Sequence, residues 1–377
     1  MDDPNVPIKY MDRTRHYYRA LGYTRDYIWA TFDDVPFSQL TKPLSESRIA
    51  LVTTASPIDF DGVKRVWSGP VSPPPPKLFT NNVAWDKEST HTNDRTSFLP
   101  IEAAAELASE GLFGGLTARF HGVPTEYSQR KTLTEDAPQI LARLREDKAD
   151  AAVLCPLCPV CHQTVSLVGR HLEANGIPTV IIGSALDVVE HCGVPRFYFT
   201  DFPLGNPCGH PWQPDMQRQI VRQALTLFEA AKTPRTTIKA PHSWWEDGAI
   251  WRARYGHVDP ADKERLLKLG EERRRQQSTA KQTIAVSPES HPLSAGRRPM
   301  KMRVGVLDHY NVSTRKLEET VHFYENVLGF TNGPRPPFNF PGAWLYSSGH
   351  PVLHLNDISQ TEKQQLSDLG PPQRTDS

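Results

Sequence analysis

The chain of 377 residues carries 43 basic and 43 acidic side chains, so its formal net charge is zero. This balance, without a basic stripe, argues against nucleic acid and against an anionic membrane as partners. The polar N-terminal stretch lacks the apolar core of a signal peptide, and no apolar run approaches the ~20 residues of a membrane span. These features favour the cytoplasm, where thiols stay reduced.

Composition divides the chain into four segments. Residues 1–46 form an aromatic-rich N-terminal extension. Residues 47–232 alternate short apolar runs with amphipathic helical patterns, which predicts an α/β domain with a doubly wound, mostly parallel sheet. Residues 233–300 predict a Trp-rich and charged helical linker that is partly disordered. Residues 301–377 then begin afresh with an expected strand over Met302–Asp308.

Elements of the α/β segment follow from hydrophobic periodicity. The expected strands are Arg48–Thr54, Ala149–Leu154, Pro178–Ile182 and Arg196–Thr200. The expected helices are Ile101–Glu110, Ala137–Glu146, His162–Ala174 and Pro214–Ala231, and a charged helix is expected over Pro260–Gln277. Ligands bind such sheets at the carboxyl ends of the parallel strands, so residues that follow the strands are candidates for a site.

Three cysteines follow the expected strand 149–154 in the order Cys155-Pro-Leu-Cys158-Pro-Val-Cys161. Pro156 can occupy a first helical position, which predicts Cys155 at a strand end and at a helix N-terminus. Free N–H groups and the helix dipole would stabilise a thiolate there. Cys158 or Cys161 would lie on the same side of the helix as a resolving thiol. His162 is either a proton carrier or a helix surface residue.

Other interpretations of these cysteines stay open. They could be small core residues, or they could bind zinc with Cys192, Cys208 or a histidine as the fourth ligand. An iron–sulfur cluster is a further alternative, although Val165 stands where the bacterial ferredoxin run has its fourth cysteine.

Polar residues at the first strand are candidates for substrate binding. Thr53, Thr54 and Ser56 end this strand at the sheet edge expected for Cys155, and they would either bind a carboxylate or serve as turn residues. Cys208 lies in the loop 203–211, which could fold back over the site, and it is a further candidate for substrate contact.

Residues 1–232 resemble the B-subunit family of glycine, sarcosine, betaine and D-proline reductases, the selenoprotein B family. The matching stretches are Arg48–Ser56, His91–Gly122, Ala149–Ala174, Gly176–Ile182 and Pro195–Pro211. The family motif is selenocysteine-x-x-Cys-x-x-Cys. On this sequence the place of the selenocysteine falls on Cys155, and those of the two cysteines fall on Cys158 and Cys161.

The resemblance implies an oxidoreductase that reductively cleaves a C–N or similar C–heteroatom bond of a small amino-acid-like substrate. A Cys155 thiolate would attack carbon, and Cys158 or Cys161 would resolve the adduct. A thiol donor such as a thioredoxin would supply electrons, and a pyruvoyl group, if used, would come from a partner subunit. The alternative is a non-catalytic subunit of a reductase complex that binds zinc or an iron–sulfur cluster.

Met302–Asp357 resembles one βαβββ half of the vicinal oxygen chelate superfamily, which includes glyoxalases and dioxygenases. The resemblance is carried by Val304–Asn311, Ser313–Phe330, Gly342–Tyr346 and Val352–Asn356. It implies a divalent metal bound by His309 and His354, and with it a metal-dependent lyase or dioxygenase-like activity. A complete site needs two such modules, so we expect this one to be incomplete unless a homodimer completes it.

Overall fold

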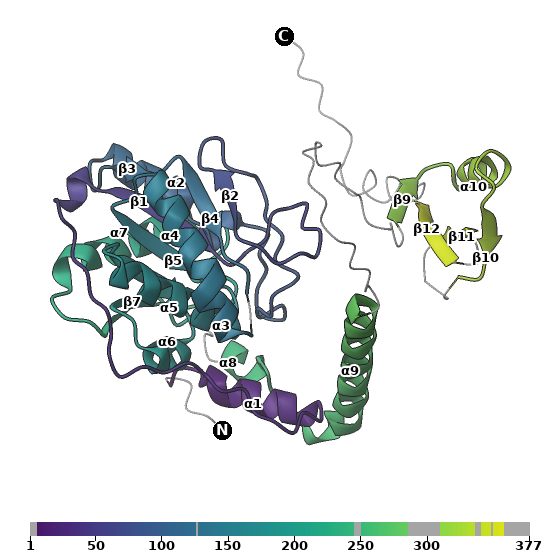
Figure 1. The fold of residues 1–377 in the computed structure, drawn as a ribbon, viewed down its shortest axis with the longest axis horizontal. Coiled ribbons are helices and arrows are strands. Elements are labelled where there is room, and N and C mark those ends of the chain that lie inside the picture. Colours follow the sequence, from purple (N-terminus) through teal and green to yellow (C-terminus); the bar gives the residue numbers. More distant parts are fainter. Residues whose placement is uncertain are drawn as a thin grey trace, which may run out of the picture. The chain divides into compact units, whose positions relative to one another are not determined.

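The chain divides into two compact units, Met1–Pro288 and Glu289–Ser377. The structure is a computed structural model that describes residues 6–125, 127–244, 250–285, 310–335, 341–347 and 350–357. Figure 1 shows the elements of each unit along the chain.

A mostly parallel sheet forms the centre of the first unit. Its strands lie in the order β2-β4-β1-β5-β6-β7-β8, and β3 pairs with β1. All these pairs are parallel except β2 with β4. The strands are β1 (Arg48–Thr53), β2 (Trp67–Pro70), β3 (Gly115–Leu116), β4 (Arg119–Gly122), β5 (Ala151–Cys155), β6 (Thr179–Gly183), β7 (Arg196–Phe199) and β8 (Thr236–Lys239). The predicted α/β class with a mostly parallel sheet is confirmed.

Helices cover both faces of this sheet because alternate side chains of a strand point to opposite faces. Ile49 and Leu51 of β1 pack in the same core as α2 (Ile101–Ser109) and α7 (Pro214–Ala230). Ala50 and Val52 pack on the other face, in a second core that includes residues of α4 and α5. The helices that follow the central strands are α4 (Ala137–Glu146), α5 (Pro159–Ala174) and α6 (Leu186–Cys192).

The N-terminal extension lies against α5 and α6. It contains α1 (Tyr10–Ala20). The backbone N–H of Met11 donates to Asp187 at 2.9 Å, and that of Ala30 donates to Gln163 at 2.8 Å. Arg170 donates to the carbonyl oxygen of Asp34 at 2.8 Å. These bonds tie a segment without strands to the α/β sheet unit.

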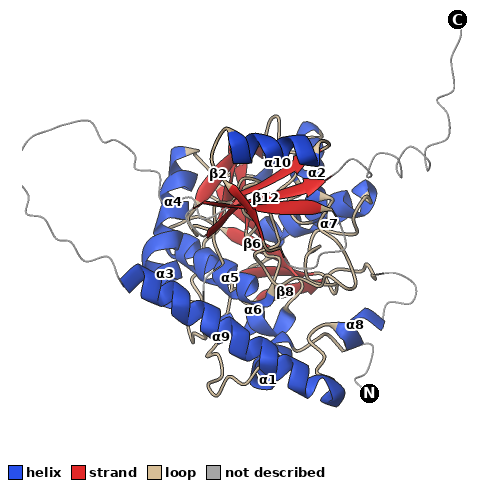
Figure 2. Cartoon of the chain, turned by 90° about the vertical axis from the view of Figure 1, so that its right-hand side faces the viewer, coloured by secondary structure: helices blue, strands red, loops and turns tan. Residues whose placement is uncertain are grey.

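A long helix, α9 (Lys263–Ala285), lies beside the end of α1, as Figure 2 shows. Arg274 donates to the carbonyl oxygen of Leu21 at 2.7 Å. The helix expected over Pro260–Gln277 begins at Lys263 and continues to Ala285. The remaining short elements of this unit are α3 (Gln129–Lys131), a π-helical turn (Thr132–Asp136), α8 (Ile250–Arg254) and 3₁₀ turns at Leu44–Glu46, Arg95–Ser97 and Pro260–Asp262.

The second unit contains a small sheet in the order β10-β11-β12-β9. Its elements are β9 (Tyr310–Thr314), α10 (Leu317–Asn326), β10 (Thr331–Gly333), β11 (Gly342–Ser347) and β12 (His350–Asp357). The three strands β10, β11 and β12 are antiparallel, and β9 runs parallel to β12. The expected strand Met302–Asp308 lies outside the described residues, and the assignment to a vicinal oxygen chelate half-module stays a prediction.

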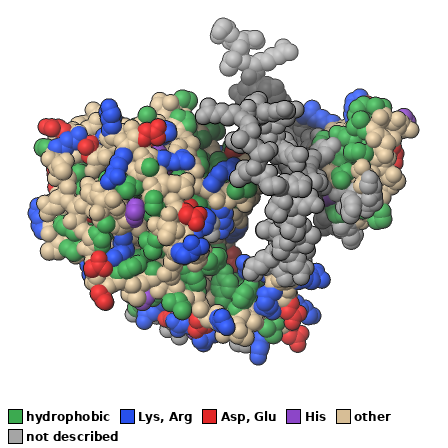
Figure 3. Space-filling model, viewed as in Figure 1, with side chains coloured by type: hydrophobic (Ala, Val, Ile, Leu, Met, Phe, Trp, Pro, Cys, Tyr) green, Lys and Arg blue, Asp and Glu red, His purple; other side chains and the backbone are tan. Residues whose placement is uncertain are grey.

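Charge is mixed on the surface of the first unit. On the face shown in Figure 3, blue basic and red acidic side chains are interspersed. Within the described parts of the chain, no helix has the combined length and apolarity needed to cross a bilayer.

Candidate functional site

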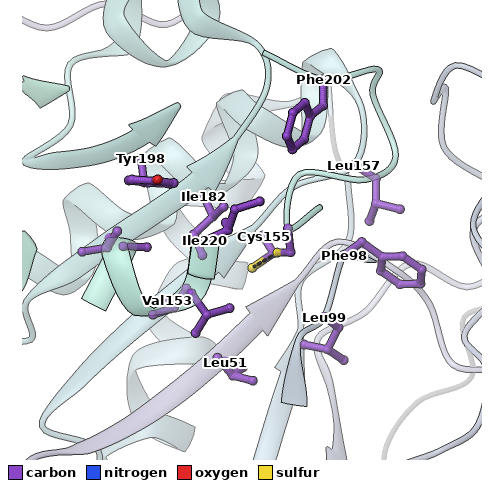
Figure 4. Packing of buried hydrophobic residues seen from close by; sticks show 14 of the residues in the cluster. Leu51, Phe98, Leu99, Val153, Cys155, Leu157, Ile182, Tyr198, Phe202 and Ile220 are labelled. Carbon is purple, nitrogen blue, oxygen red and sulfur yellow. Dashed lines mark hydrogen bonds between the residues drawn. The ribbon is translucent and has the colours of Figure 1, made fainter. Parts of the chain in front are cut away.

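Cys155 is the last residue of β5, and it pairs in register with Thr53 of β1. Its side chain is fully buried in the core that α2 and α7 cover. Figure 4 shows it at the strand end, near the loop that carries Phe202 and close to Phe98. The Cys208 Sγ donates to the Cys155 Sγ at 3.5 Å. The first thiol of the motif therefore lies at the predicted sheet edge, in contact with a thiol from outside the motif.

The helix after β5 begins three residues later than Pro156 would place it. Its first residue is Pro159, and Cys158 is the N-cap, with its sulfur accepting from the N–H of Cys161 at 3.2 Å. The N–H of Leu157 donates to the Thr54 Oγ1 at 3.1 Å, which ties the non-helical link to β1. The predicted position of Cys155 at a helix N-terminus is therefore wrong, and the helix dipole acts on Cys158 instead.

Cys158 and Cys161 form a second thiol pair, with their sulfur atoms 2.6 Å apart. Burial raises the pKa of Cys158 well above its ordinary value, and the hydrogen bond to Cys161 raises it further. Burial also acts to raise the pKa of Cys161, but hydrogen bonds from Cys158, Thr125 and Thr54 outweigh it and lower that pKa to about 7. Near neutral pH this pair can hold one thiolate, on Cys161, and one proton, on Cys158.

The loop that carries Cys208 is fixed by backbone and side-chain hydrogen bonds. The N–H of Cys208 donates to the carbonyl oxygen of Ser97 at 2.8 Å. Asn206 donates to the Ser97 hydroxyl at 2.7 Å, and Thr200 donates to the carbonyl oxygen of Pro207 at 2.8 Å. Burial raises the pKa of the Cys208 thiol well above its ordinary value, so this sulfur keeps its proton. The predicted substrate contact of Cys208 stays untested, and its sulfur contacts Cys155.

His162 is fully buried in α5, so the interpretation as a helix surface residue is wrong. Its Nδ1 donates to the carbonyl oxygen of Cys158 at 2.7 Å. Its Nε2 accepts from the backbone N–H groups of Ser184 at 2.8 Å and Ala185 at 3.1 Å. Burial lowers its pKa to about 4, so the ring is neutral at physiological pH. Both ring nitrogens hold backbone groups in place, and the ring is a positioning element for Cys158.

The three polar residues predicted at the end of β1 have different surroundings. The Thr53 Oγ1 accepts from the N–H of Ala55 at 3.2 Å, which is a turn interaction. Thr54 bonds to Leu157 and Cys161, so it supports the motif. The Ser56 Oγ accepts from Asn82 at 2.9 Å. The structure therefore joins Thr54 to the cysteines.

A small surface hollow opens at this sheet edge. Ser56, Lys64, Arg65, Asn82 and Thr125 are among its lining residues. The Thr125 hydroxyl also lies 2.9 Å from the Cys161 Sγ, so it connects the hollow to the second thiol pair.

Thr125 is a site residue that the sequence reasoning missed. It follows β4, a short strand of four residues that the hydrophobic pattern did not reveal. Since β4 pairs in parallel with β1, its carboxyl end reaches the same sheet edge as Thr54. Had β4 been recognised in the sequence, the residues that follow it, including Thr125, would have been candidates for the site.

In the described parts of the chain, no three His, Cys, Asp or Glu side chains are placed to hold a metal ion. The zinc and iron–sulfur alternatives for the cysteines therefore have no ligand group there. Cys192 lies in a separate apolar cluster with Ala30 and Leu167. His354 lies on β12, where its ring stacks on Trp344 with the centroids 4.0 Å apart. His309 lies outside the described residues, so one of the two expected metal ligands can be placed.

Curated relatives of the chain are reductase subunits. D-proline reductase subunit gamma of Acetoanaerobium sticklandii is 29% identical over 217 residues, which make up 55% of this chain and 89% of that subunit. The glycine reductase complex component B subunit gamma of Symbiobacterium thermophilum is 25% identical over 228 residues, 56% of this chain and 52% of that subunit. The chain spans about half the length of the glycine reductase subunits that it matches.

The C-terminal part is similar to a different protein. Glyoxylase I 4 of Arabidopsis thaliana is 42% identical over 59 residues, 15% of this chain and 33% of that protein. No protein-family model matches the chain, and no solved structure is significantly similar to it. The predicted resemblance to the reductase B-subunit family is confirmed by these homologues, and the glyoxalase match supports the resemblance of the C-terminal module.

Proposed function

We propose that this homologue of amino-acid reductase B subunits is a thiol-dependent reductase subunit. Its substrate is a small amino-acid-like molecule in which a C–N or similar C–heteroatom bond is cleaved by reduction. Cys155 is the attacking sulfur, and a second thiol resolves the adduct. Support for this proposal comes from the homologues, which are named as subunits of D-proline and glycine reductases.

The observation that carries the proposal is the concentration of thiols at one sheet edge. Cys155 ends β5 and contacts Cys208, while Cys158 and Cys161 contact each other at the start of the next helix. A nucleophilic sulfur needs a nearby thiol, because reductive cleavage of the substrate consumes two electrons and a dithiol supplies two when it becomes a disulfide.

Electrons return to the site from an external dithiol such as a thioredoxin. The Cys161 thiolate, with its pKa of about 7, is suited to thiol–disulfide exchange near neutral pH. Thr125 connects this pair to the surface hollow. The amino substrate requires activation, and a pyruvoyl group on a partner subunit is the proposed source of it.

A non-catalytic metal-binding subunit is the competing hypothesis for the cysteines. Among the described residues the three motif thiols and Cys208 contact each other in two pairs, and no three of them converge as metal ligands. This arrangement favours the reductase. The metal expected at His309 and His354 stays a prediction for the C-terminal module.

The proposal is tested on the chain purified with its native partner subunits. D-proline, glycine, sarcosine and betaine are each added to the fully reduced complex without an external reductant, and the remaining thiols are titrated. We expect one of them to remove two thiols per cleaved bond, and Cys155→Ser to abolish both the cleavage and the thiol loss. Cys192→Ser is the matched control, because Cys192 lies in a separate cluster. Cleavage that persists at the wild-type rate in Cys155→Ser would sink the proposal.

A further inference from the structure

We propose that Cys208 is the thiol that resolves the Cys155 adduct, so that the oxidised form of the site is a Cys155–Cys208 disulfide. This inference rests on the proposed function and names the second catalytic sulfur. It replaces the resolving role that the motif suggests for Cys158 or Cys161.

The sulfur contacts distinguish the two candidates. Cys208 donates its S–H to the Cys155 Sγ across 3.5 Å, although 53 residues separate the two in sequence. The sulfur atoms of Cys158 and Cys161 instead contact each other at 2.6 Å, and the N–H of Cys161 also donates to the Cys158 sulfur. The chain therefore contains two thiol pairs, and the motif residue Cys155 pairs outside its own motif.

The backbone around Cys208 presents this sulfur to Cys155. Gly205 and Gly209 adopt positive φ angles of 116° and 126°, which L side chains rarely adopt, and they bracket the turn. The N–H of Cys208 is fixed on Ser97 by a 2.8 Å bond. To form a disulfide, the two sulfur atoms must approach from 3.5 Å to about 2.05 Å.

The chemistry balances in two steps. In the first, the Cys155 thiolate attacks the substrate carbon, an S–C bond forms, and the C–N bond breaks with its electron pair on nitrogen, which takes a proton and leaves as an amine. In the second, the Cys208 sulfur attacks the Cys155 sulfur. An S–S bond forms, the S–C bond breaks, and the electron pair stays on carbon, which takes up the proton released by Cys208. The substrate is reduced by two electrons and the dithiol is oxidised by two, and an external dithiol regenerates it.

The proton of Cys208 is in place for the second step. Because burial raises the pKa of Cys208 well above its ordinary value, this thiol stays protonated while Cys155 accepts its hydrogen bond. Because the thiolate is the attacking form of a cysteine, Cys208 gives up this proton as its sulfur attacks, and the proton goes to the carbon that leaves the Cys155 sulfur.

The positions of the trypsin sites make a direct test possible. Trypsin releases Cys155, Cys158 and Cys161 together in the peptide 149–170, Cys192 in 171–196 and Cys208 in 197–218. A link between 149–170 and 197–218 therefore reports a bond of Cys208 to the motif, whereas a bond within the motif leaves 197–218 free.

The full-length reduced chain is treated with diamide, its remaining thiols are alkylated in denaturant, and the peptides are mapped without reduction. We expect 149–170 linked to 197–218 in the wild type and in the Cys158→Ser/Cys161→Ser variant. The link should be lost in Cys155→Ser and in Cys208→Ser, and Cys192→Ser should keep it. Recovery of 197–218 as a free alkylated peptide, while Cys155 is bonded within the motif or stays reduced, would overturn the assignment of Cys208.

This map needs no substrate, so its outcome is separate from that of the proposed function. If the wild type cleaves the substrate but its peptide map lacks the link, only the assignment of Cys208 as the resolving thiol is overturned, and the proposed function stands. A second measurement uses the reduced complex and the substrate found to be cleaved: Cys208→Ser should accumulate the substrate fragment on peptide 149–170, and the wild type should release it. Multiple-turnover cleavage by Cys208→Ser at the wild-type rate would also overturn the inference.

Discussion

The His162 Nδ1 donates to the carbonyl oxygen of Cys158 at 2.7 Å, and so it fixes the residue that caps α5. The other ring nitrogen accepts from the backbone after β6, at Ser184 and Ala185. One neutral imidazole therefore joins two loops at the carboxyl edge of the sheet.

His162→Leu should destabilise the chain, because it leaves the buried N–H groups of Ser184 and Ala185 without their acceptor. An unsatisfied buried group costs about 1–3 kcal/mol, so we expect the free energy of unfolding to fall by about 3 kcal/mol in urea denaturation. His171→Leu is the matched control, because His171 is half-buried on the same helix. Equal effects of the two substitutions would contradict the positioning role of His162.

Acid should weaken the fold through the same ring. Burial lowers the pKa of His162 from 6.5 to about 4, so the unfolded chain takes up a proton below pH 6.5 that the native chain takes up only near pH 4. Stability is therefore lost as pH falls from 6.5 to 4, by about 3 kcal/mol for this group. Urea titrations of the wild type and His162→Leu across this range should show their difference in unfolding free energy narrowing. A difference that stays constant with pH would contradict the linkage.

Thr125→Val should raise the pKa of Cys161. The substitution keeps the shape of the side chain but removes a hydroxyl that lies 2.9 Å from the sulfur and lowers its pKa. The measurement uses a chain in which Cys155, Cys192 and Cys208 are changed to serine, so that only Cys158 and Cys161 remain. Its thiolate absorbance, followed against pH, should show the pKa of Cys161 shifted upwards by Thr125→Val. Thr134→Val, at an exposed threonine, is the control. An unchanged titration would remove Thr125 from the site.

Arg196→Met should be strongly destabilising. Arg196 and Glu173 form an ion pair of 2.9 Å with both side chains fully buried, and removal of one partner from such a pair costs about 3–5 kcal/mol. The double variant Arg196→Met/Glu173→Gln should lose less than Arg196→Met alone, since no uncompensated charge remains. Arg218→Met, which breaks an exposed pair with Glu110, should change the urea midpoint little. Additive losses in the double variant would contradict a buried charge.

Deletion of the second unit should leave the first unit folded. A chain that ends at Pro288 keeps α9 against α1 and should retain the calorimetric transition of the first unit. A chain that ends at Asp262 loses α9, which packs on Leu21, and its transition should shift to lower temperature. If both truncations unfold at the same temperature as the first unit of the full chain, the α1–α9 contact contributes nothing to its stability.

Regular elements of the first unit were largely predictable, because their hydrophobic patterns are strong. The helix Ala137–Glu146 has the predicted bounds, and the strand expected over Ala149–Leu154 is shifted by one or two residues to Ala151–Cys155. Short strands such as β4 escaped prediction because four residues carry too little pattern to distinguish a strand from a loop.

The sequence predicted which cysteines belong to the candidate site, but it did not predict which of them contact each other. Pro156 and Pro159 both suit a first helical position, and the helix begins at Pro159, after a link in which the Leu157 N–H bonds to Thr54 beyond the end of β1. The contact of Cys208 with Cys155 depends on how a distant loop folds. Tertiary contacts of this kind leave no local trace in the sequence.

The complete burial of Cys155 determines what its alkylation rate measures. With no exposed surface, its sulfur meets an alkylating reagent only when the surrounding loops open. The observed alkylation rate is then the intrinsic rate multiplied by the fraction of time spent open, as in amide hydrogen exchange. A slow rate would measure closure rather than a weak nucleophile, and a substrate or partner subunit that opens the loops would raise it.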